Sequence, residues 1–134
     1  MTEVVLDASA LLALLLGEPG AHEVEETIPH AVVSTVNYSE VVAKLANNGM
    51  PDVEIRSALA SLDLELRPFD RGQAFQCGLL RPATRHLGLS LGDRACLALG
   101  VSLGLPVLTM DRAWARLSVG VTIRVVRGRR TQSP

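Results

Sequence analysis

The stretch VVLDASALLALLLGEPG, residues 4–20, decides how the rest of the sequence is interpreted. Residues 4–6 form a short apolar run, which is typical of a strand buried on both faces of a sheet. Residues 10–16 are apolar throughout and predict a buried helix, with Ser9 as its N-cap. A single charge, Asp7, separates the two apolar segments. Because an unpaired carboxylate is costly to bury, its position requires an explanation.

The apolar run at residues 8–16 does not indicate a membrane protein. A spanning helix needs roughly 20 apolar residues, and this run is far shorter. A secretory signal begins with positive charge, whereas Glu3 and Asp7 precede this run. We therefore expect a cytoplasmic protein with no membrane partner.

The chain has the composition of one globular domain. It contains 134 residues, of which 48% are hydrophobic, so a disordered chain is excluded. We expect a single domain over residues 1–126, followed by a polar, flexible tail over residues 127–134. The formal net charge of −1 provides no overall basic field that would attract nucleic acid. All but one of the 13 Lys and Arg residues are arginines, which reflects either genomic composition or phosphate recognition.

Cysteine and histidine form no disulfide or zinc-binding pattern. Cys77 and Cys96 make no CxxC pair, and the three histidines lack metal-ligand spacing. We therefore expect two buried, reduced cysteines and no zinc site.

The remaining sequence alternates between strand and helix patterns. Short apolar runs predict strands at residues 31–34, 64–68, 106–110 and 121–126. Apolar residues at helical spacing predict helices at residues 22–27, 36–48, 51–62, 69–86 and 91–103, and a helical turn at 111–117. Pro82 is expected to kink or end the helix that contains it. We therefore predict a three-layer α/β/α fold with a central, mainly parallel sheet of four to five strands.

Four carboxylates lie close to the ends of these predicted elements: Asp7, Glu40, Asp93 and Asp111. In an open parallel sheet, chemistry takes place beyond the carboxyl ends of the strands, so all four are expected in one region. Taken singly, each is more often a helix cap or a solvated charge than a catalytic residue. Glu40 and Asp93, however, stand on apolar helix faces, where an unpaired carboxylate is costly. A shared site accounts for all four positions.

Such a site requires a counter-ion, because clustered carboxylates repel one another and no lysine accompanies them. Ligation by oxygen alone favours Mg²⁺ or Mn²⁺ over zinc. A metal of this kind lowers the pKa of a bound water and neutralises a phosphodiester in its transition state. The residues therefore favour metal-dependent phosphodiester chemistry.

Four segments in this order resemble the PIN-domain family, specifically the VapC-type toxins of type II (VapBC) toxin–antitoxin systems. They are VVLDASALLALLLGEPG around Asp7, STVNYSEVVAKL around Glu40, LSLGDRACLALG around Asp93 and PVLTMDRAWARL around Asp111. The resemblance implies a PIN-like fold and a metal-dependent endoribonuclease that hydrolyses RNA such as tRNA or rRNA, by in-line attack of a metal-activated water. It also implies a homodimer or a toxin–antitoxin hetero-oligomer, with a VapB-type antitoxin that blocks the acidic site.

The same resemblance assigns roles to individual residues. All four acids are expected to act in catalysis and in binding Mg²⁺ or Mn²⁺, with Asp7 and Asp93 as the leading direct ligands. Glu40 and Asp111 are expected to bind through water or to support a second ion.

Five further residues are expected to support the acids or to contact RNA. Ser9 and Thr109 are expected to hold metal-bound water or phosphate. Asn37 is expected to contact the side chains that bind the metal and not the metal itself. Arg94 and Arg112 stand next to acids and are expected to contact RNA phosphates. Solvent-exposed helix charge is an equally good interpretation of both arginines.

Other functional classes fit less well. A receiver domain would have paired acids after its first strand and a late lysine, and a haloacid-dehalogenase phosphatase would have a second aspartate in place of Ser9. The main alternative is a PIN-like module that binds RNA or a partner without nuclease activity. A cleavage assay on the purified protein separates these two functions.

Overall fold

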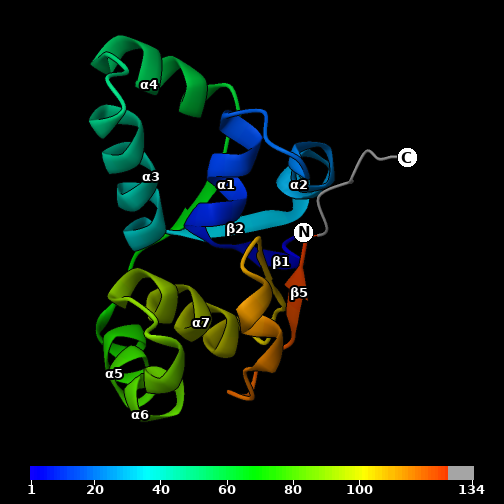
Figure 1. Ribbon diagram of the computed structural model, residues 1–134, viewed down its shortest axis with the longest axis vertical. Coiled ribbons are helices and arrows are strands. Elements are labelled where there is room, and N and C mark those ends of the chain that lie inside the picture. The colour runs from blue at the N-terminus through cyan, green and yellow to red at the C-terminus, as the bar shows by residue number, and fades with distance from the viewer. Residues whose placement is uncertain (127–134) are drawn as a thin grey trace.

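In the computed structural model, which describes residues 1–126, five parallel strands form one sheet. The strands are β1 (Val4–Leu6), β2 (Ala31–Ser34), β3 (Glu65–Arg67), β4 (Val107–Thr109) and β5 (Ile123–Val125), in the spatial order β3-β2-β1-β4-β5 (Figure 1). The predicted parallel sheet is confirmed. The tail expected at residues 127–134 lies outside the described residues.

Helices cover both faces of this sheet (Figure 1). One face carries α1 (Ala8–Leu15), α2 (Ala21–Thr27), η1 (Ile28–His30), α3 (Thr35–Asn47) and α4 (Asp52–Ala60), which together we call the α1–α4 layer. The other face carries α5 (Arg71–Leu79), α6 (Arg81–Thr84), η2 (Arg85–Leu87), α7 (Leu91–Leu103) and η3 (Arg112–Arg116), which we call the α5–η3 layer. The predicted three-layer α/β/α fold is therefore confirmed.

The residues of β1 explain why the sheet lies between two hydrophobic cores. Val4 and Leu6 belong to the core under the α1–α4 layer, whereas Val5 belongs to the core under the α5–η3 layer. Successive side chains of a strand point to opposite faces, so a strand covered on both sides is apolar throughout. By the same alternation, the next residue, Asp7, is directed toward the α5–η3 side of the sheet.

α7 is buried over most of its length. Residues 95–100 are all buried, because the helix lies between the sheet, α5 and α3. Gly100 permits close packing on β4, since a Cβ at this position would come within 2.7 Å of Val107 Cγ2. This packing also places the first turn of α7, which contains Asp93, next to α3.

Two local predictions need correction. The N-cap of α1 is Asp7 and not Ser9, because Asp7 has extended backbone and its Oδ1 accepts the Ala10 N–H at 2.9 Å. The helix predicted at residues 69–86 is divided into α5, α6 and η2. Pro82 interrupts it as predicted, but it lies in the first turn of α6, where its missing N–H leaves no bond unmade.

The prediction for the cysteines is confirmed, because Cys77 and Cys96 are both buried and free. Among residues 1–126, none of the helices combines the length and the apolar character that crossing a membrane requires.

Candidate active site

Asp7 is buried at the carboxyl end of β1, in the middle of the sheet edge. Only 3% of its surface is exposed. Leu6 of β1 pairs with Leu108 of β4, which brings Asp7 beside Thr109 at the end of the neighbouring strand. The predicted position of Asp7 at the carboxyl edge of the sheet is therefore the observed one.

Two hydroxyl groups hold the Asp7 carboxylate. Thr109 Oγ1 donates to Asp7 Oδ2 at 2.5 Å, and Ser9 Oγ donates to Asp7 Oδ1 at 2.7 Å. Since each hydroxyl directs its O–H at Asp7, its oxygen is left to accept hydrogen bonds from other groups. The Met110 N–H donates to Ser9 Oγ at 3.0 Å. The Asp111 N–H donates to Thr109 Oγ1 at 3.1 Å, so the network fixes the carboxylate against the main chain that comes after β4.

Burial raises the pKa of Asp7 from 3.8 to about 6. The hydrogen bonds from Thr109, Ala10 and Ser9 oppose this rise, and the nearby charge of Asp93 adds to it. Because the charged form is the one that burial penalises, a cation bound at this carboxylate would bring the pKa down again. The position therefore favours binding of a positive charge.

Glu40 lies at the junction of α3 and α7. Asn37 stands one turn earlier on α3, and its Nδ2 donates to Glu40 Oε1 at 2.9 Å and to the Gly92 carbonyl at 3.0 Å. Both partners are acceptors, so the amide nitrogen must face them. Asn37 Oδ1 is left buried with no partner among residues 1–126. A Cβ at Gly92 would collide with the Glu40 carboxylate, so only glycine permits this arrangement.

Asp93 stands in the first turn of α7 and is partly exposed. It forms a capping box with Ser90, in which Ser90 Oγ accepts the Asp93 N–H at 3.1 Å and Asp93 Oδ2 accepts the Ser90 N–H at 2.9 Å. The interpretation of Asp93 as a helix-terminal charge is thus correct, while its Oδ1 is not used by the cap. The positive end of the α7 dipole favours both this carboxylate and that of Glu40.

Cys96 shows which of the acids lie close together. Burial is the main reason that the pKa of its thiol lies well above the usual range, and three nearby carboxylates raise it further: Asp7, Asp93 and Glu40. These three acids therefore surround the first two turns of α7. Asp111 is joined to them through the Thr109 hydroxyl, which binds both Asp7 and the Asp111 N–H.

Asp111 is exposed and acts as the N-cap of η3. Its Oδ1 accepts the Ala113 N–H at 2.9 Å. The cap interpretation therefore describes its contacts, and a catalytic role for Asp111 stays a prediction.

The two arginines expected to contact phosphate have different surroundings. Arg94 is partly buried against α5, where its Nη1 donates to the Cys77 carbonyl at 3.2 Å, so it is not a solvated helix charge. Arg112 is exposed in the first position of η3. RNA binding by either residue stays a prediction, and Arg112 is the more accessible of the two.

Within residues 1–126, no three Asp, Glu, His or Cys side chains form a ready-made metal site. The donor chemistry nevertheless fits a hard divalent cation. The nearby donors are carboxylate oxygens and the unpartnered Asn37 Oδ1, while the high pKa of Cys96 keeps its sulfur protonated. Binding of Mg²⁺ or Mn²⁺ therefore stays a prediction.

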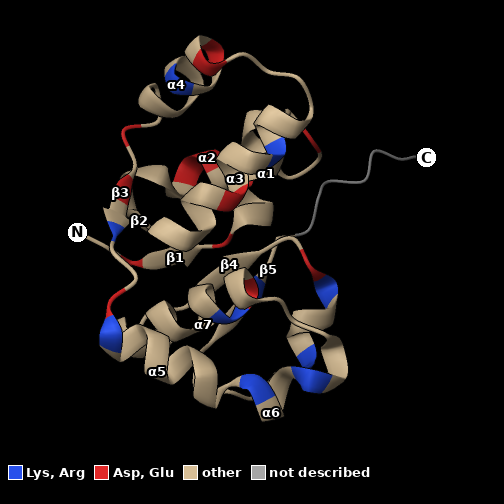
Figure 2. Cartoon of the chain, turned by 90° about the vertical axis from the view of Figure 1, so that its left-hand side faces the viewer, with Lys and Arg blue, Asp and Glu red and all other residues tan. Residues whose placement is uncertain are grey.

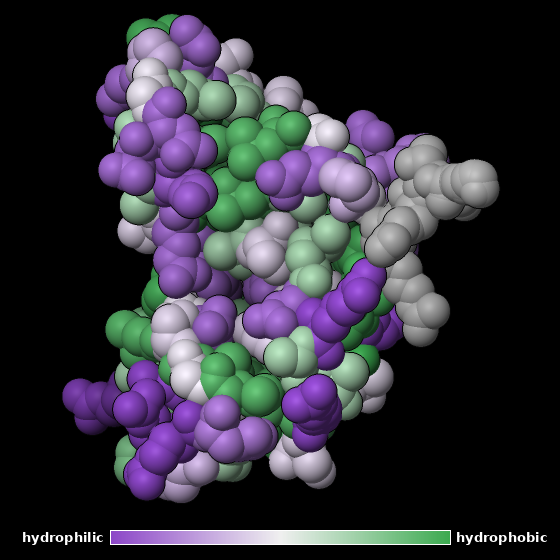
Figure 3. All heavy atoms as spheres, in the orientation of Figure 1, coloured by the Kyte–Doolittle hydropathy of each residue, from purple (hydrophilic) through white to green (hydrophobic). Residues whose placement is uncertain are grey.

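An open hollow of about 550 Å³ lies at the junction of α3 and α7, and of the four acids Glu40 lines it. Ser39 and Glu40 of α3 form one side of it, and Ser90 and Gly92 of α7 form the other. The surface is indented between the upper and lower halves of the molecule on this side (Figure 3). Because the hollow is open, it is accessible to a polymer chain.

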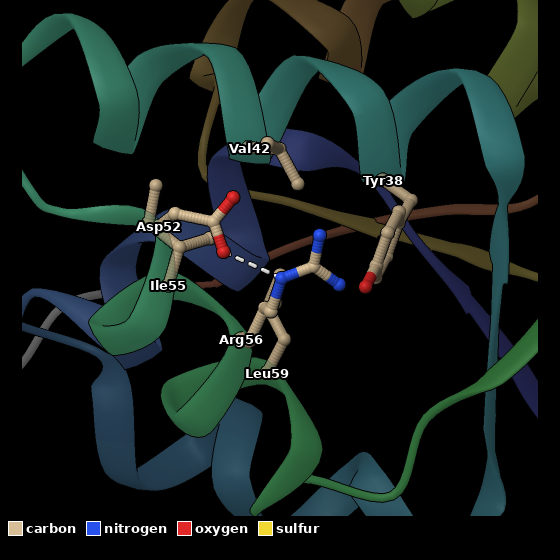
Figure 4. Close-up of a pocket in the computed structure, with 6 residues that line it drawn as sticks. All are labelled: Tyr38, Val42, Asp52, Ile55, Arg56 and Leu59. Atoms are coloured by element: carbon tan, nitrogen blue, oxygen red, sulfur yellow. Dashed lines mark hydrogen bonds and ion pairs between the residues drawn. The ribbon is translucent and has the colours of Figure 1, made fainter.

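A second hollow, of about 250 Å³, lies between α3 and α4. Its charged groups are Asp52 and Arg56, which form an ion pair at 2.5 Å, and the Arg56 guanidinium points toward Tyr38 (Figure 4). None of the four acids lines this hollow. It therefore does not extend the candidate active site.

Sequence reasoning missed Ser90 and Gly92. The role of Ser90 could have been predicted, because Ser with Asp three residues later is a capping-box pattern. The need for glycine at position 92 had none, because the group that excludes a side chain is Glu40, from a distant part of the sequence.

Comparison with known proteins identifies relatives of this fold. Residues 4–120 match the family described as the PIN domain. No curated protein matches the sequence significantly.

Three solved structures illustrate the likeness. A DNA-bound VapBC from Salmonella typhimurium matches with a TM-score of 0.74 and 18% identity, covering 95% of this chain and 100% of that one. A toxin–antitoxin complex from Klebsiella pneumoniae matches with a TM-score of 0.71 and 19% identity, covering 93% and 98%. VapBC-5 from Mycobacterium tuberculosis matches with a TM-score of 0.61 and 24% identity, covering 95% and 99%. At these identities the likeness establishes a shared fold.

Proposed function

Because the chain belongs to the PIN-domain family, we propose that it is a metal-dependent endoribonuclease and the cytoplasmic toxin of a VapBC-type toxin–antitoxin pair. The observation that carries this proposal is the environment of Asp7. Its carboxylate is buried at the carboxyl edge of the sheet, held by two hydroxyls, and raised in pKa to about 6. A buried carboxylate is costly unless it binds a partner of opposite charge.

The proposed ligands of Mg²⁺ or Mn²⁺ are Asp7 and Asp93, with Glu40 and Asp111 in support. When bound, such an ion lowers the pKa of water and neutralises charge on a phosphodiester. Ser9 and Thr109 hold the Asp7 carboxylate in one orientation. Asn37 does the same for Glu40.

Substrate access is supported by the open hollow that Glu40 lines. The acids repel an RNA backbone, so binding needs compensation from the cation and from arginines such as Arg112. We propose single-stranded regions of RNA, such as those of tRNA or rRNA, as the substrate.

The proposed partners are a VapB-type antitoxin and a second copy of this chain. Support comes from the three structural neighbours: two are described as VapBC, one of them DNA-bound, and the third is described as a toxin–antitoxin complex. An antitoxin segment that covers the sheet edge at Asp7 would prevent access of RNA to the acids.

A cleavage assay on antitoxin-free protein tests the proposal. We expect fluorescently labelled tRNA, rRNA fragments or single-stranded RNA to be cut with Mg²⁺ or Mn²⁺ and to stay intact with EDTA. Asp70→Asn is the matched control for Asp7→Asn, because Asp70 is also a helix N-cap, for α5, but is exposed and lies outside the site.

Two results would contradict the proposal. In one, the folded, metal-supplied protein leaves every RNA intact, which favours a binding module without nuclease activity. In the other, Asp7→Asn cuts as fast as Asp70→Asn, which assigns the cleavage to a contaminant.

A further inference from the structure

Charge is divided unequally between the two layers of helices. Residues 1–70 contain twelve Asp and Glu but only three Lys and Arg, whereas residues 71–126 contain two acids and seven arginines. This division matches the fold, because the first segment forms the α1–α4 layer and the second forms the α5–η3 layer. In Figure 2 the acidic ribbon segments gather in the upper half and the basic ones in the lower half. The net charge of the whole chain conceals this separation.

The two acids of the second segment are Asp93 and Asp111, and both belong to the candidate active site. Outside that site, the α5–η3 layer carries only positive ionised side chains among its described residues. Apart from Asp93 and Asp111, the charged side chains are therefore mainly acidic in the first segment and basic in the second. A polyanion that reaches the acids meets repulsion on one side and attraction on the other.

Five arginines of this layer are exposed and free of ion pairs within residues 1–126: Arg71, Arg81, Arg85, Arg112 and Arg116. Arg71 lies at the start of α5, and the other four lie in α6, η2 and η3; we call these four the arginine face. The arginines of the opposite segment differ, since Arg56 pairs with Asp52 at 2.5 Å and Arg67 with Glu65 at 3.7 Å. An unpaired guanidinium retains all its donors for an incoming ligand.

The arginine face adjoins the acids along the chain. η2, which begins with Arg85, leads directly into the Ser90–Asp93 capping box, and η3 begins at the residue after Asp111. Both turns are anchored in the same hydrophobic core, through Leu87 and Trp114. These arginines are therefore attached to the same layer as Asp93 and Asp111.

We propose that the arginine face binds the phosphates of RNA that flank the scissile bond, so that the strand leaves the site over the α5–η3 layer and not over the α1–α4 layer. This inference rests on the proposed function for the nature of the substrate. Guanidinium groups match phosphate oxygens in a two-pronged geometry, and four of them offset the repulsion from the neighbouring acids. An acidic protein segment is the competing occupant, and the test includes it.

The experiment measures RNA affinity in EDTA, where cleavage does not interfere. Arg85→Gln/Arg116→Gln removes two charges from the arginine face, and Arg56→Gln/Arg67→Gln removes two from the opposite segment as the matched control. We expect the first variant to bind labelled single-stranded RNA at least about tenfold more weakly and to lower the slope of log Kd against log salt by about 1.4. The control should change affinity by less than about twofold.

Melting temperatures of the two double variants and of the four single variants show whether each protein is folded. Because these arginines are at the surface, their replacement is not expected to affect folding. Equal losses in both double variants, or no loss in either, would overturn the proposal. So would unchanged RNA binding together with weaker binding of the antitoxin, which would assign the face to an acidic protein partner.

The outcome is separable from that of the proposed function. If RNA binding depends on Arg85 and Arg116 but no RNA is cut with Mg²⁺ or Mn²⁺, the nuclease assignment is wrong and the role of the arginine face in RNA binding is supported. If the wild type cuts RNA and the Arg85→Gln/Arg116→Gln variant binds and cuts equally well, the role of the arginine face in RNA binding is contradicted and the nuclease assignment is supported.

Discussion

Asp7 and Asp111 come after neighbouring strands, β1 and β4, and each is the N-cap of the next helical segment, yet their surroundings differ. Asp7 is 3% exposed and accepts bonds from two hydroxyls and one amide. Asp111 is exposed and accepts the Ala113 N–H. The same local pattern of strand, aspartate and helix thus produces one buried carboxylate and one surface carboxylate.

The difference arises from the helical segment that each aspartate caps. α1 has eight residues, and its Ala10 and Leu11 are buried in a core, so the start of the helix is enclosed. η3 has five residues and is anchored by Trp114, which leaves the preceding aspartate at the surface. Packing of the capped helix therefore decides whether the carboxylate loses its water. A carboxylate that has lost water gains more from a bound cation than one that stays hydrated.

The largest predicted effect is the difference in RNA cleavage between Asp7→Asn and Asp111→Asn. We expect Asp7→Asn to lower RNA cleavage by about a thousandfold or more, equivalent to roughly 4 kcal/mol of transition-state stabilisation. Asp111→Asn should lower it by only about tenfold, because Asp111 is exposed and sits at the edge of the network. Single-turnover cleavage rates measure both. Equal losses in the two variants would mean that burial does not distinguish their roles.

The second prediction concerns pH and stability without metal. The folded protein holds the Asp7 proton with a pKa of about 6, against 3.8 for an ordinary aspartate. Since the folded state binds this proton more tightly than the unfolded chain, raising the pH from about 4 to about 6 removes stability, by roughly 3 kcal/mol. Denaturant unfolding in EDTA should show this loss in the wild type and a smaller loss in Asp7→Asn. Asp111→Asn should behave as the wild type, and a parallel response of all three proteins would contradict the buried state of Asp7.

The third prediction tests the junction of α3 and α7. Gly92→Ala puts a methyl group where the Glu40 carboxylate lies, so that side chain must move and lose its bond from Asn37. Because the displaced group is the end of a flexible side chain, we expect a nearly unchanged melting temperature but a ten- to hundredfold slower cleavage, roughly 1.4 to 2.7 kcal/mol.

Gly78→Ala on α5 is the matched control for Gly92→Ala, since a Cβ there meets no atom within 4 Å. It should keep full activity and gain up to about 1 kcal/mol from helix propensity. A Gly92→Ala protein that cuts RNA at the wild-type rate would show that the position of Glu40 is not important.

The smallest predicted effect is the stabilisation by metal. Binding of Mg²⁺ or Mn²⁺ at about ten times its Kd should add roughly 1.4 kcal/mol and raise the melting temperature by a few degrees. The rise should disappear in Asp7→Asn and largely persist in Asp111→Asn. Differential scanning fluorimetry against a metal-free EDTA baseline provides the measurement. An undiminished rise in Asp7→Asn would place the cation elsewhere.

The positions of the acids at the ends of strands and helices were predictable from the sequence, but their environments were not. Asp7 was recognised because it interrupts two apolar runs, and the structure places it at the predicted edge. Asp93, which the helical spacing places on an apolar face, is partly exposed and forms a capping box with Ser90, as the Ser-x-x-Asp pattern indicates. Ser9 was predicted as the N-cap and instead donates to the true cap, Asp7. Neighbouring polar residues compete for such local roles, and the competition is settled by contacts with distant residues.

The sequence by itself determined the alternation of strands and helices and the position of the acids at the ends of these elements, because periodicity and caps are local properties of the chain. The parallel sheet then follows from the order of the elements, since strands that alternate with helices pair in parallel. Only the tertiary structure decided which acid is buried, which glycine must lack a side chain and where charge is segregated. The Thr109 hydroxyl that holds Asp7 is 102 positions away in sequence, and the Gly92 carbonyl that holds Asn37 is 55 positions away. Contacts of this kind form only when distant segments pack, and they control the burial and hydrogen bonding on which the proposed chemistry depends.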